Sequence, residues 1–308
     1  MDDWVKEYFK LMFSESILET YRAMSIKQNH MPKMLYKYRS INPQENGTSR
    51  TIEALKANVL YSSPPVKFND IFECPIVYDY EHLPQWLYRH AFYIITNYSQ
   101  KYDADREFTY ESLYQLYREI NGVEDNELVK QLFEGKLLEA VLIRKNCYTI
   151  VSFSETYDNE LMWAHYADFS KGFCIGYDFS NLDDNDLLSV CTLPVEYNDN
   201  QSFSFPKSED VWGLTAMHAL STKSKAWAYE KEWRYFNIGS ETGCSFKVQM
   251  PKPKAIYAGS MINFKWFSEL AEYCRENSIL LYRMKPDYEK HTLNPESMYF
   301  NEEIINAQ

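Results

Sequence analysis

The hydrophobic period of this 308-residue chain changes twice, and the change restricts how the chain can fold. Apolar and polar residues alternate in Met34–Arg39 and Val59–Ser63, as they do in strands. Between residues 82 and 147 the apolar residues recur at helical spacing, and strand patterns resume at Tyr148–Phe153. We therefore expect a single α+β domain over residues 1–308, with a mixed, largely antiparallel central sheet and a helical insertion or cap at 82–147.

The remaining segments also have recognisable periods. Residues 3–25 are expected to form one amphipathic N-terminal helix within a helical segment, residues 1–30, that His30-Met31-Pro32 ends. A helix is also expected at Lys265–Asn277. The later segments expected to form strands are Gly172–Phe179, Leu193–Tyr197, Trp233–Ile238, Ser245–Gln249, Ala255–Ala258 and Ile279–Met284.

The composition indicates a folded protein with an acidic surface. The chain is 45% hydrophobic and 17% aromatic, which is ample material for a core, and its formal net charge is −12. Such a charge repels phosphate backbones, so nucleic acid is expected to bind only through a local basic cleft. The best candidate for that cleft is the cluster Lys223, Lys225, Lys231 and Arg234.

Neither secretion nor membrane insertion is expected. Residues 1–7 lack the basic and apolar regions of a signal peptide, and the apolar runs are too short to span a bilayer. The six cysteines are scattered and include no Cys-x-x-Cys pair. We expect a cytoplasmic protein with reduced thiols.

Several common enzyme classes are excluded by missing motifs. The chain has nine glycines, and none forms Gly-x-Gly-x-x-Gly or a Walker loop. A standard Rossmann dehydrogenase, a P-loop NTPase and a protein kinase are therefore excluded. The Gly-x-Ser-x-Gly and His-Glu-x-x-His motifs of common hydrolases and zinc proteases are also missing, and the histidines are dispersed, so no metal is expected.

The stretch Lys225–Arg234 is the most unusual part of the chain. If it becomes extended near Glu230, then Glu230, Glu232 and Arg234 point to one face, because strand side chains alternate. Two carboxylates and a guanidinium that converge on a cleft can perform acid–base chemistry or stabilise a cation. A solvated strand edge, or a helix end with a Glu230–Arg234 pair, explains the same residues equally well.

Three other stretches contain residues suited to binding. Tyr38 and Arg39 lie in a segment whose aromatic and cationic side chains could hold a phosphate and stack a ring, or could blunt an edge strand. Asn69 and Asp70 follow a Pro-Pro pair and are better explained as a rigid turn. His165 is a candidate general base, but no partner that would orient it is identifiable, so a structural histidine is the favoured interpretation.

Six motifs in this order resemble the bacterial family called domain of unknown function 2971. The resemblance covers about residues 34–285 and carries no assigned chemistry. The motifs are Leu35-Tyr36-Lys37-Tyr38-Arg39, Phe68-Asn69-Asp70, Ser152-Phe153-Ser154, Met162-Trp163-Ala164-His165-Tyr166-Ala167, Gly172-Phe173-Cys174-Ile175 and Trp227-Ala228-Tyr229-Glu230-Lys231-Glu232-Trp233-Arg234.

A second resemblance implies an activity. A strand with an arginine, a helix, a strand with Ser-Ser and a distant Glu-x-Glu are similar to the Arg–Ser–Glu plan of ADP-ribosyltransferases. The resemblance implies that Arg39 binds the phosphates of NAD, that Ser62 or Ser63 braces the site, that Glu232 is the catalytic glutamate and that Glu230 orients the acceptor. This sequence departs from the family at two points. Tyr61-Ser62-Ser63 stands where the family has a Ser-Thr-Ser strand, and the helical region at 82–147 separates the serines from the glutamates.

Two functions are therefore open. The first is an NAD-consuming transferase or glycohydrolase, for which the family context implies a role in phage defence or as a toxin; the macromolecular acceptor is unknown. The second is a non-catalytic module that binds a nucleotide or a protein. Beside the catalytic pair, the expected substrate-binding residues are Tyr38, Arg39, Ser62, Ser63, Asn69, Asp70, Ser154, Trp163, His165, Tyr166, Lys225, Trp227 and Arg234.

Overall fold

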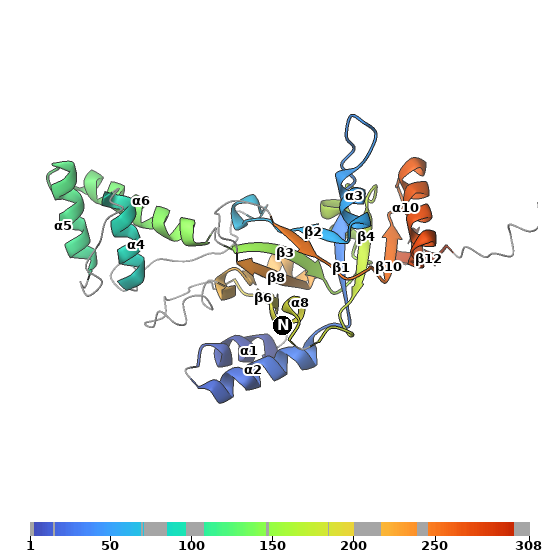
Figure 1. The fold of residues 1–308 in the computed structure, drawn as a ribbon, viewed down its shortest axis with the longest axis horizontal. Helices are drawn as coiled ribbons and strands as arrows, with labels where there is room; N and C mark the ends of the chain where they lie inside the picture. Colours follow the sequence, from blue (N-terminus) through green and yellow to red (C-terminus); the bar gives the residue numbers. More distant parts are fainter. Residues whose placement is uncertain are drawn as a thin grey trace, which may run out of the picture.

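An eight-stranded sheet forms the centre of the protein (Figure 1). The computed structural model describes residues 3–14, 16–68, 70, 85–96, 108–145, 148–183, 185–199, 217–238 and 246–298. All neighbouring strands of this sheet are antiparallel except the parallel pair β10–β11, so the expected mixed, largely antiparallel α+β fold is confirmed. In spatial order the strands are β12 (Thr292–Ser297), β11 (Leu280–Asp287), β10 (Ala255–Ala258), β4 (Phe173–Asp178), β1 (Met34–Arg39), β3 (Tyr148–Ser154), β8 (Glu232–Ile238) and β5 (Thr192–Pro194).

Two short sheets flank the large one. In the first, β2 (Val59–Tyr61) pairs antiparallel with β9 (Lys247–Gln249), and in the second, β6 (Glu196–Tyr197) pairs parallel with β7 (Thr222–Lys223). The single strand expected at Leu193–Tyr197 is thus wrong, because the chain passes from β5 in the large sheet to β6 in a separate one. The helical elements around these sheets are α3 (Arg50–Lys56), η1 (Pro65–Lys67), α7 (Glu160–Tyr166), α8 (Leu187–Val190), η4 (Lys225–Glu230) and the longer α10 (Phe264–Glu276).

The N-terminal segment forms two helices rather than the single helix expected. They are α1 (Asp3–Met12) and α2 (Ile17–His30), which lie side by side below the sheet in Figure 1. Between them the hydroxyl of Ser14 accepts a hydrogen bond from the backbone N–H of Ser16, which competes with continuation of the helix. Apolar residues at the start of α2 suggested a continuous buried stripe, but Leu18 is 80% exposed.

The helical region contains α4 (Gln85–Thr96), α5 (Tyr110–Asn121) and α6 (Glu127–Lys145), which lie to one side of the sheet (Figure 1). Their buried residues, with Phe133 at the centre, form a hydrophobic cluster distinct from those of the sheet. Thr109 and Gly122 delimit α5 by a capping box and a left-handed C-cap. The single-domain organisation over residues 1–308 stays a prediction. Among the described helices, none is long and apolar enough to cross a membrane.

Strand β3 has two different partners along one edge. Its end pairs with β1 through Tyr36 and Ser154, whereas its beginning pairs with Ser63, whose backbone exchanges two hydrogen bonds of 2.9 Å with Ile150. β2 therefore joins β3 through Ser63 instead of becoming a strand of the central sheet. β1 and the segment after β2 diverge on either side of Ser152, and this divergence leaves an opening in the sheet edge.

A close backbone contact holds the end of β1 in place. A Cβ atom on Gly172 would lie 2.1 Å from the carbonyl oxygen of Arg39, so only glycine permits this approach. Gly259 is constrained in the same way by the carbonyl of Ser170, the last of three consecutive residues with left-handed φ angles. The glycine of the motif at 172–175 is thus explained by the packing of β4 against the end of β1.

Candidate functional site

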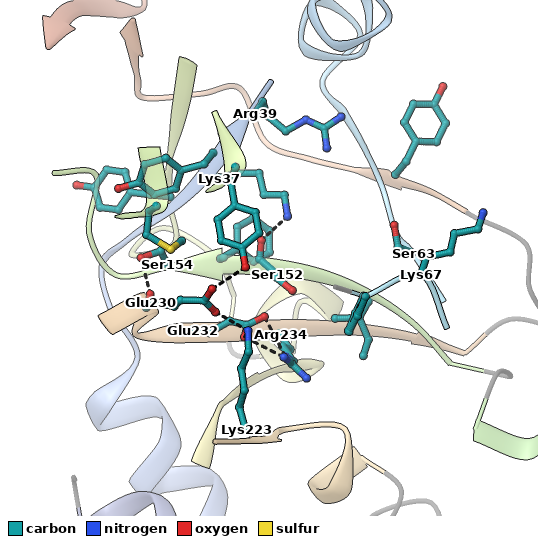
Figure 2. A pocket seen from close by; sticks show the side chains of 18 residues that line it. Lys37, Arg39, Ser63, Lys67, Ser152, Ser154, Lys223, Glu230, Glu232 and Arg234 are labelled. Carbon is teal, nitrogen blue, oxygen red and sulfur yellow. Dashed lines mark hydrogen bonds and ion pairs between the residues drawn. The ribbon is translucent and has the colours of Figure 1, made fainter. Parts of the chain in front are cut away.

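A cavity of about 300 Å³ lies at the opening between β1 and Ser63, and we call it the first pocket (Figure 2). β1, β3 and β8 provide much of its wall, and Tyr166 of α7 and Lys223 of β7 also line it. It contains five cationic side chains and two carboxylates, although the whole chain is strongly acidic. These charged residues are Lys37, Arg39, Lys67, Lys223, Arg234, Glu230 and Glu232.

The two carboxylates reach the pocket from different elements. Glu230 is the last residue of η4, and Glu232 is the first residue of β8. Lys231 between them has a left-handed backbone with φ 44°, which turns the chain from η4 into the strand. The hydroxyl of Ser154 donates a 2.7 Å hydrogen bond to the carbonyl of Glu230 and ties this turn to the end of β3.

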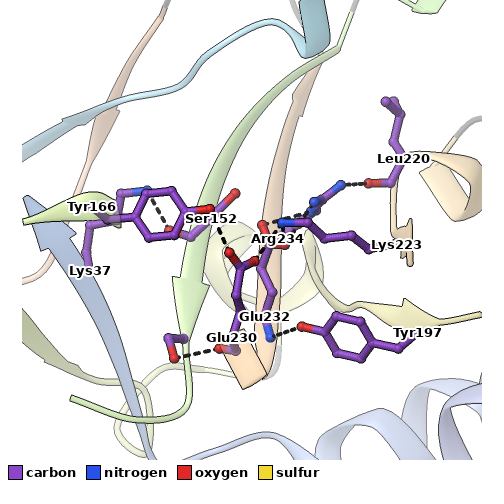
Figure 3. Close-up of polar contacts among 10 residues, drawn as sticks. Lys37, Ser152, Tyr166, Tyr197, Leu220, Lys223, Glu230, Glu232 and Arg234 are labelled. Atoms are coloured by element: carbon purple, nitrogen blue, oxygen red, sulfur yellow. Dashed lines mark hydrogen bonds and ion pairs between the residues drawn. The ribbon is translucent and has the colours of Figure 1, made fainter. Parts of the chain in front are cut away.

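Glu232 lies in a buried ion cluster (Figure 3). Its Oε1 atom is 3.0 Å from Nε of Arg234, and its Oε2 atom is 2.8 Å from Nη2 of the same guanidinium. Lys223 bridges the carboxylates, with Nζ 3.4 Å from Oε2 of Glu232 and 2.6 Å from Oε2 of Glu230. Arg234 also donates to the carbonyl of Leu220. The predicted solvated strand edge is therefore wrong for these side chains, because all of them are buried.

The surroundings shift the pKa values of the carboxylates in opposite directions. Burial alone would raise the pKa of Glu232, but Arg234 and Lys223 outweigh it and hold that pKa well below its usual range. Burial and the negative charge of Glu232 raise the pKa of Glu230, although Lys223 and the hydroxyl of Tyr166, 2.6 Å from Oε1, favour its charged form. Two neighbouring carboxylates with divergent pKa values are typical of sites that need an acid and a base.

Three cations on the pocket have no carboxylate partner among the described residues. Lys37 donates to the carbonyl of Ser152 at 2.6 Å, on the edge of β3 that β1 leaves open, whereas Arg39 and Lys67 form no ion pair in the described part of the chain. Burial and the neighbouring Arg39 lower the pKa of Lys37 to about 8. Glu232 and Glu230 offset part of the charge of Lys37, whereas Arg39 and Lys67, without an ion pair in the described structure, favour an anionic ligand such as a phosphate.

Eight of the residues predicted from the sequence line this cavity. Ser63 lines it and Ser62 does not, because the Ser62 hydroxyl is buried and donates to Thr149 at 2.7 Å. Ser62 thus braces β2 against β3 from behind the pocket. The eight lining residues are Tyr38, Arg39, Ser63, Ser154, Tyr166, Glu230, Glu232 and Arg234.

The other predicted residues lie outside the cavity wall. Trp163 is fully buried and packs edge-on against Tyr38, with ring centroids 5.3 Å apart. His165 is exposed, and Lys225 is also exposed, with an ion pair of 3.6 Å to Asp199.

Trp227 and Asp70 were also predicted to bind substrate, and neither lines the cavity. Trp227 is half-buried, and the Nζ atom of Lys223 lies 4.6 Å from the centroid of its ring. Asp70 is buried but does not line the cavity. Asn69 lies outside the described residues.

Sequence reasoning missed several residues that line or support the site. Lys37 was detectable, because in an extended segment it shares a face with Arg39 two residues later. Lys223 was noticed only as part of a basic cluster, since β7 has two residues and no period to recognise. Tyr197, whose hydroxyl accepts a 2.8 Å hydrogen bond from the N–H of Glu232, is brought there by the pairing of β6 with β7.

The site was also compared with metal centres and with known proteins. Within the ranges that the structure describes, no group of three or more His, Cys, Asp or Glu side chains could hold a metal ion. Neither a curated protein nor a solved structure matches the chain. Residues 162–235, which include three of the six motifs quoted from the sequence, match the model of a family described as Protein of unknown function (DUF2971), and this match confirms the predicted resemblance.

Proposed function

We propose that the protein is an NAD-consuming enzyme similar to ADP-ribosyltransferases, with the nicotinamide ribose half of the dinucleotide bound in the first pocket. The observation that carries the proposal is the presence in one cavity of Arg39, Glu230 and Glu232 together with cations that lack a carboxylate partner. Arg39 would bind a phosphate of NAD, because its planar guanidinium matches phosphate oxygens in a bidentate manner. Action in the cytoplasm, for phage defence or as a toxin, belongs to the same proposal.

The chemistry requires a negative charge near the ribose. When the bond between the nicotinamide nitrogen and ribose C1′ breaks, positive charge develops on the ribose and nicotinamide leaves with the bonding electrons. Glu232 would stabilise that charge, because electrostatic stabilisation by a preorganised site often contributes more to catalysis than any other effect. Glu230, whose pKa is raised by burial and by Glu232, would take the proton of the acceptor, either water or a macromolecule, as the new bond to C1′ forms.

A second candidate is a nucleotide-binding module without turnover. It is favoured by the ion-pair contacts of Glu232. Both oxygens of its carboxylate contact Arg234, and one also contacts Lys223. A carboxylate whose charge is compensated in this way stabilises a developing cation less effectively than a free one. The two candidates predict the same ligand and differ only in whether nicotinamide is released.

The test is to incubate the purified protein with NAD and to measure nicotinamide release. Wild type is expected to turn NAD over, and Arg39→Ala is expected mainly to weaken NAD binding, because it removes a contact already present in the ground state. Glu230→Gln should lower the rate by about 10²-fold, the typical effect of losing an acid–base group. Lys290→Ala, at an exposed lysine that does not line the first pocket, is the matched control. Binding of NAD without any release would favour the module, and no binding of NAD would overturn both candidates.

A further inference from the structure

A second cavity, of about 600 Å³, adjoins the first pocket, and we call it the second pocket. Arg39 and Tyr61 line both cavities, so the two share a common wall. Arg50 and Thr51 of α3 and Lys247 of β9 are other residues of the second pocket. None of these three was singled out by the sequence.

Thr51 is a buried polar residue on the wall of the second pocket. Its side chain is only 3% exposed, and among the described residues its Oγ1 atom has no hydrogen-bond partner. Buried hydroxyl groups are nearly always hydrogen-bonded, because an unmade bond costs free energy. The Oγ1 atom is screened from solvent, so a ligand in the second pocket reaches it only if the wall around Thr51 shifts.

The charge of the second pocket points to the chemistry of that ligand. Arg39, Arg50 and Lys247 line it and form no ion pair within the described residues, and Glu53 is the only carboxylate on its wall. Such a concentration of cations in an acidic protein favours a phosphate. Tyr61, which is 44% exposed between the two cavities, offers a ring face on which a base can stack.

The sizes of the two cavities support one ligand across both. Pockets for drug-sized ligands have volumes of about 300–1,000 Å³. The first pocket, at about 300 Å³, is at the lower end of that range and suits one nucleotide better than two. Arg39 stands between the cavities and can contact phosphate on either side.

We infer that the second pocket is a phosphate-binding subsite in which the ligand of the first pocket continues past Arg39, so that this ligand carries nucleotide phosphates on both sides of the shared wall. The inference rests on the proposed function only in treating the first ligand as a nucleotide, and it requires no turnover. Two sources share this chemistry: the second half of a dinucleotide, and the 5′-phosphorylated end of a nucleic-acid strand. The experiment separates them.

The test is calorimetric titration of the full chain with three probes: ADP-ribose, a 5′-phosphorylated tetrathymidylate, and nicotinamide mononucleotide, which has a single phosphate and lacks a second nucleotide. Arg50→Ala and Lys247→Ala remove exposed side chains that form no ion pair in the described structure, so both variants should fold. Each should weaken the binding of one of the two longer probes about tenfold, the usual loss with a charge-assisted hydrogen bond. Lys290→Ala, in the β11–β12 turn, is the charge-matched control that should leave every affinity unchanged.

Thr51→Val tests the buried hydroxyl separately from the charges. The change keeps the shape of the side chain and removes an unpartnered group, so the unliganded protein should melt at the same or a higher temperature, while the affinity for the longer probe falls about fivefold. Loss confined to ADP-ribose would assign the subsite to a dinucleotide, and loss confined to the oligonucleotide would assign it to a nucleic-acid strand.

The inference and the proposed function fail in different ways. Three outcomes would overturn the second subsite. The affinities could be unchanged in all three variants, the variants could lose as much affinity for nicotinamide mononucleotide as for the longer probes, or wild type could bind neither longer probe. Nicotinamide release could still proceed in those cases. Conversely, the expected loss of ADP-ribose or oligonucleotide affinity would support the subsite even if NAD were never cleaved.

Discussion

At the scale of single residues, the buried ion cluster contributes both to the candidate site and to the stability of the fold. Glu232 and Arg234 are almost fully buried and contact each other through both carboxylate oxygens. Breaking a buried ion pair by removing one partner leaves the other charge uncompensated, which typically costs about 3–5 kcal/mol. A loss of activity in a Glu232 variant therefore has two possible causes, failed chemistry and a weakened fold.

Glu232→Gln is expected to destabilise the protein by about 3 kcal/mol, because it leaves Arg234 and Lys223 without their shared charge. Glu230→Gln should cost less, since burial and the charge of Glu232 oppose the ionised form of Glu230 and so reduce what its charge contributes to stability. Urea unfolding at neutral pH measures both. Equal destabilisation by the two changes would contradict this account of the cluster.

The double variant Glu232→Met, Arg234→Met separates the two causes of lost activity. Replacement of a whole buried ion pair by apolar side chains is often neutral or stabilising, so the double variant should regain stability relative to Glu232→Gln. If Glu232 is catalytic, nicotinamide release should stay about 10²–10³-fold below wild type even though stability returns. Recovery of activity with stability would assign Glu232 a structural role only.

At the scale of elements, single side chains and close contacts fasten the elements around the sheet. Lys27 of α2 is buried, and its Nζ atom donates 2.8 Å hydrogen bonds to the carbonyls of Ser189 and Val190 at the end of α8. These carbonyls belong to the last turn of the helix, where they have no partner within it. Trp4 of α1 stacks on Trp233 of β8, so the N-terminal helices are attached to the strand that carries Glu232.

The contribution of Lys27 to stability should depend on pH. Burial lowers its pKa to about 8 in the folded protein, whereas an exposed lysine titrates near about 10.4. Between these values the unfolded chain holds the proton more tightly, so the stability of wild type rises with pH relative to Lys27→Met, by at most about 3 kcal/mol. Unfolding of both proteins at pH 7 and pH 10 measures the difference. A wild type that gains no stability relative to Lys27→Met between pH 7 and pH 10 would contradict the burial of Lys27.

A second prediction at this scale concerns the contact between β4 and the end of β1. Gly172→Ala would place a Cβ atom 2.1 Å from a backbone carbonyl, so we expect a loss of stability of at least about 2 kcal/mol and weaker binding at the displaced Arg39. Gly135→Ala in α6 is the matched control, since nothing lies within 4 Å of its added Cβ and alanine favours a helix by up to about 1 kcal/mol. Thermal unfolding distinguishes them, and equal effects would disprove the contact.

At the scale of the whole molecule, the apolar residues form separate cores. One cluster lies between the large sheet and α10, and one joins α1 to β3, β5 and β8. Among the side chains that the structure describes, the cluster of α4, α5 and α6 shares no buried residue with either. Regions without shared contacts tend to open independently. The helical region is therefore expected to unfold without loss of the first pocket.

Phe133→Ala tests this independence. Phe133 is fully buried against the rings of Tyr110, Tyr114 and Tyr117, so its truncation should cost about 3–5 kcal/mol within the helical cluster. Hydrogen exchange should accelerate in α5 and α6 and stay unchanged in β1, β3 and β8. Faster exchange throughout the sheet would instead favour one cooperative unit, as the sequence predicts for residues 1–308.

The sequence by itself determined the types of most elements and the place of the site along the chain. The strands at Met34–Arg39 and Tyr148–Phe153 and the helical character of the region that contains α6 were predicted correctly, because the period of apolar residues is a local property. The same alternation placed Glu232 and Arg234 on one face of β8.

The tertiary structure alone decided which side chains meet. Ser63 faces the first pocket and Ser62 faces Thr149. The reason is that one edge of β3 pairs with β1 at its end and with Ser63 nearer its beginning. Lys223 reaches Glu230 and Glu232 only because β7 pairs with β6 beside β8. These contacts depend on the pairing of distant strands, which no local period encodes, so they emerge only when the chain is folded.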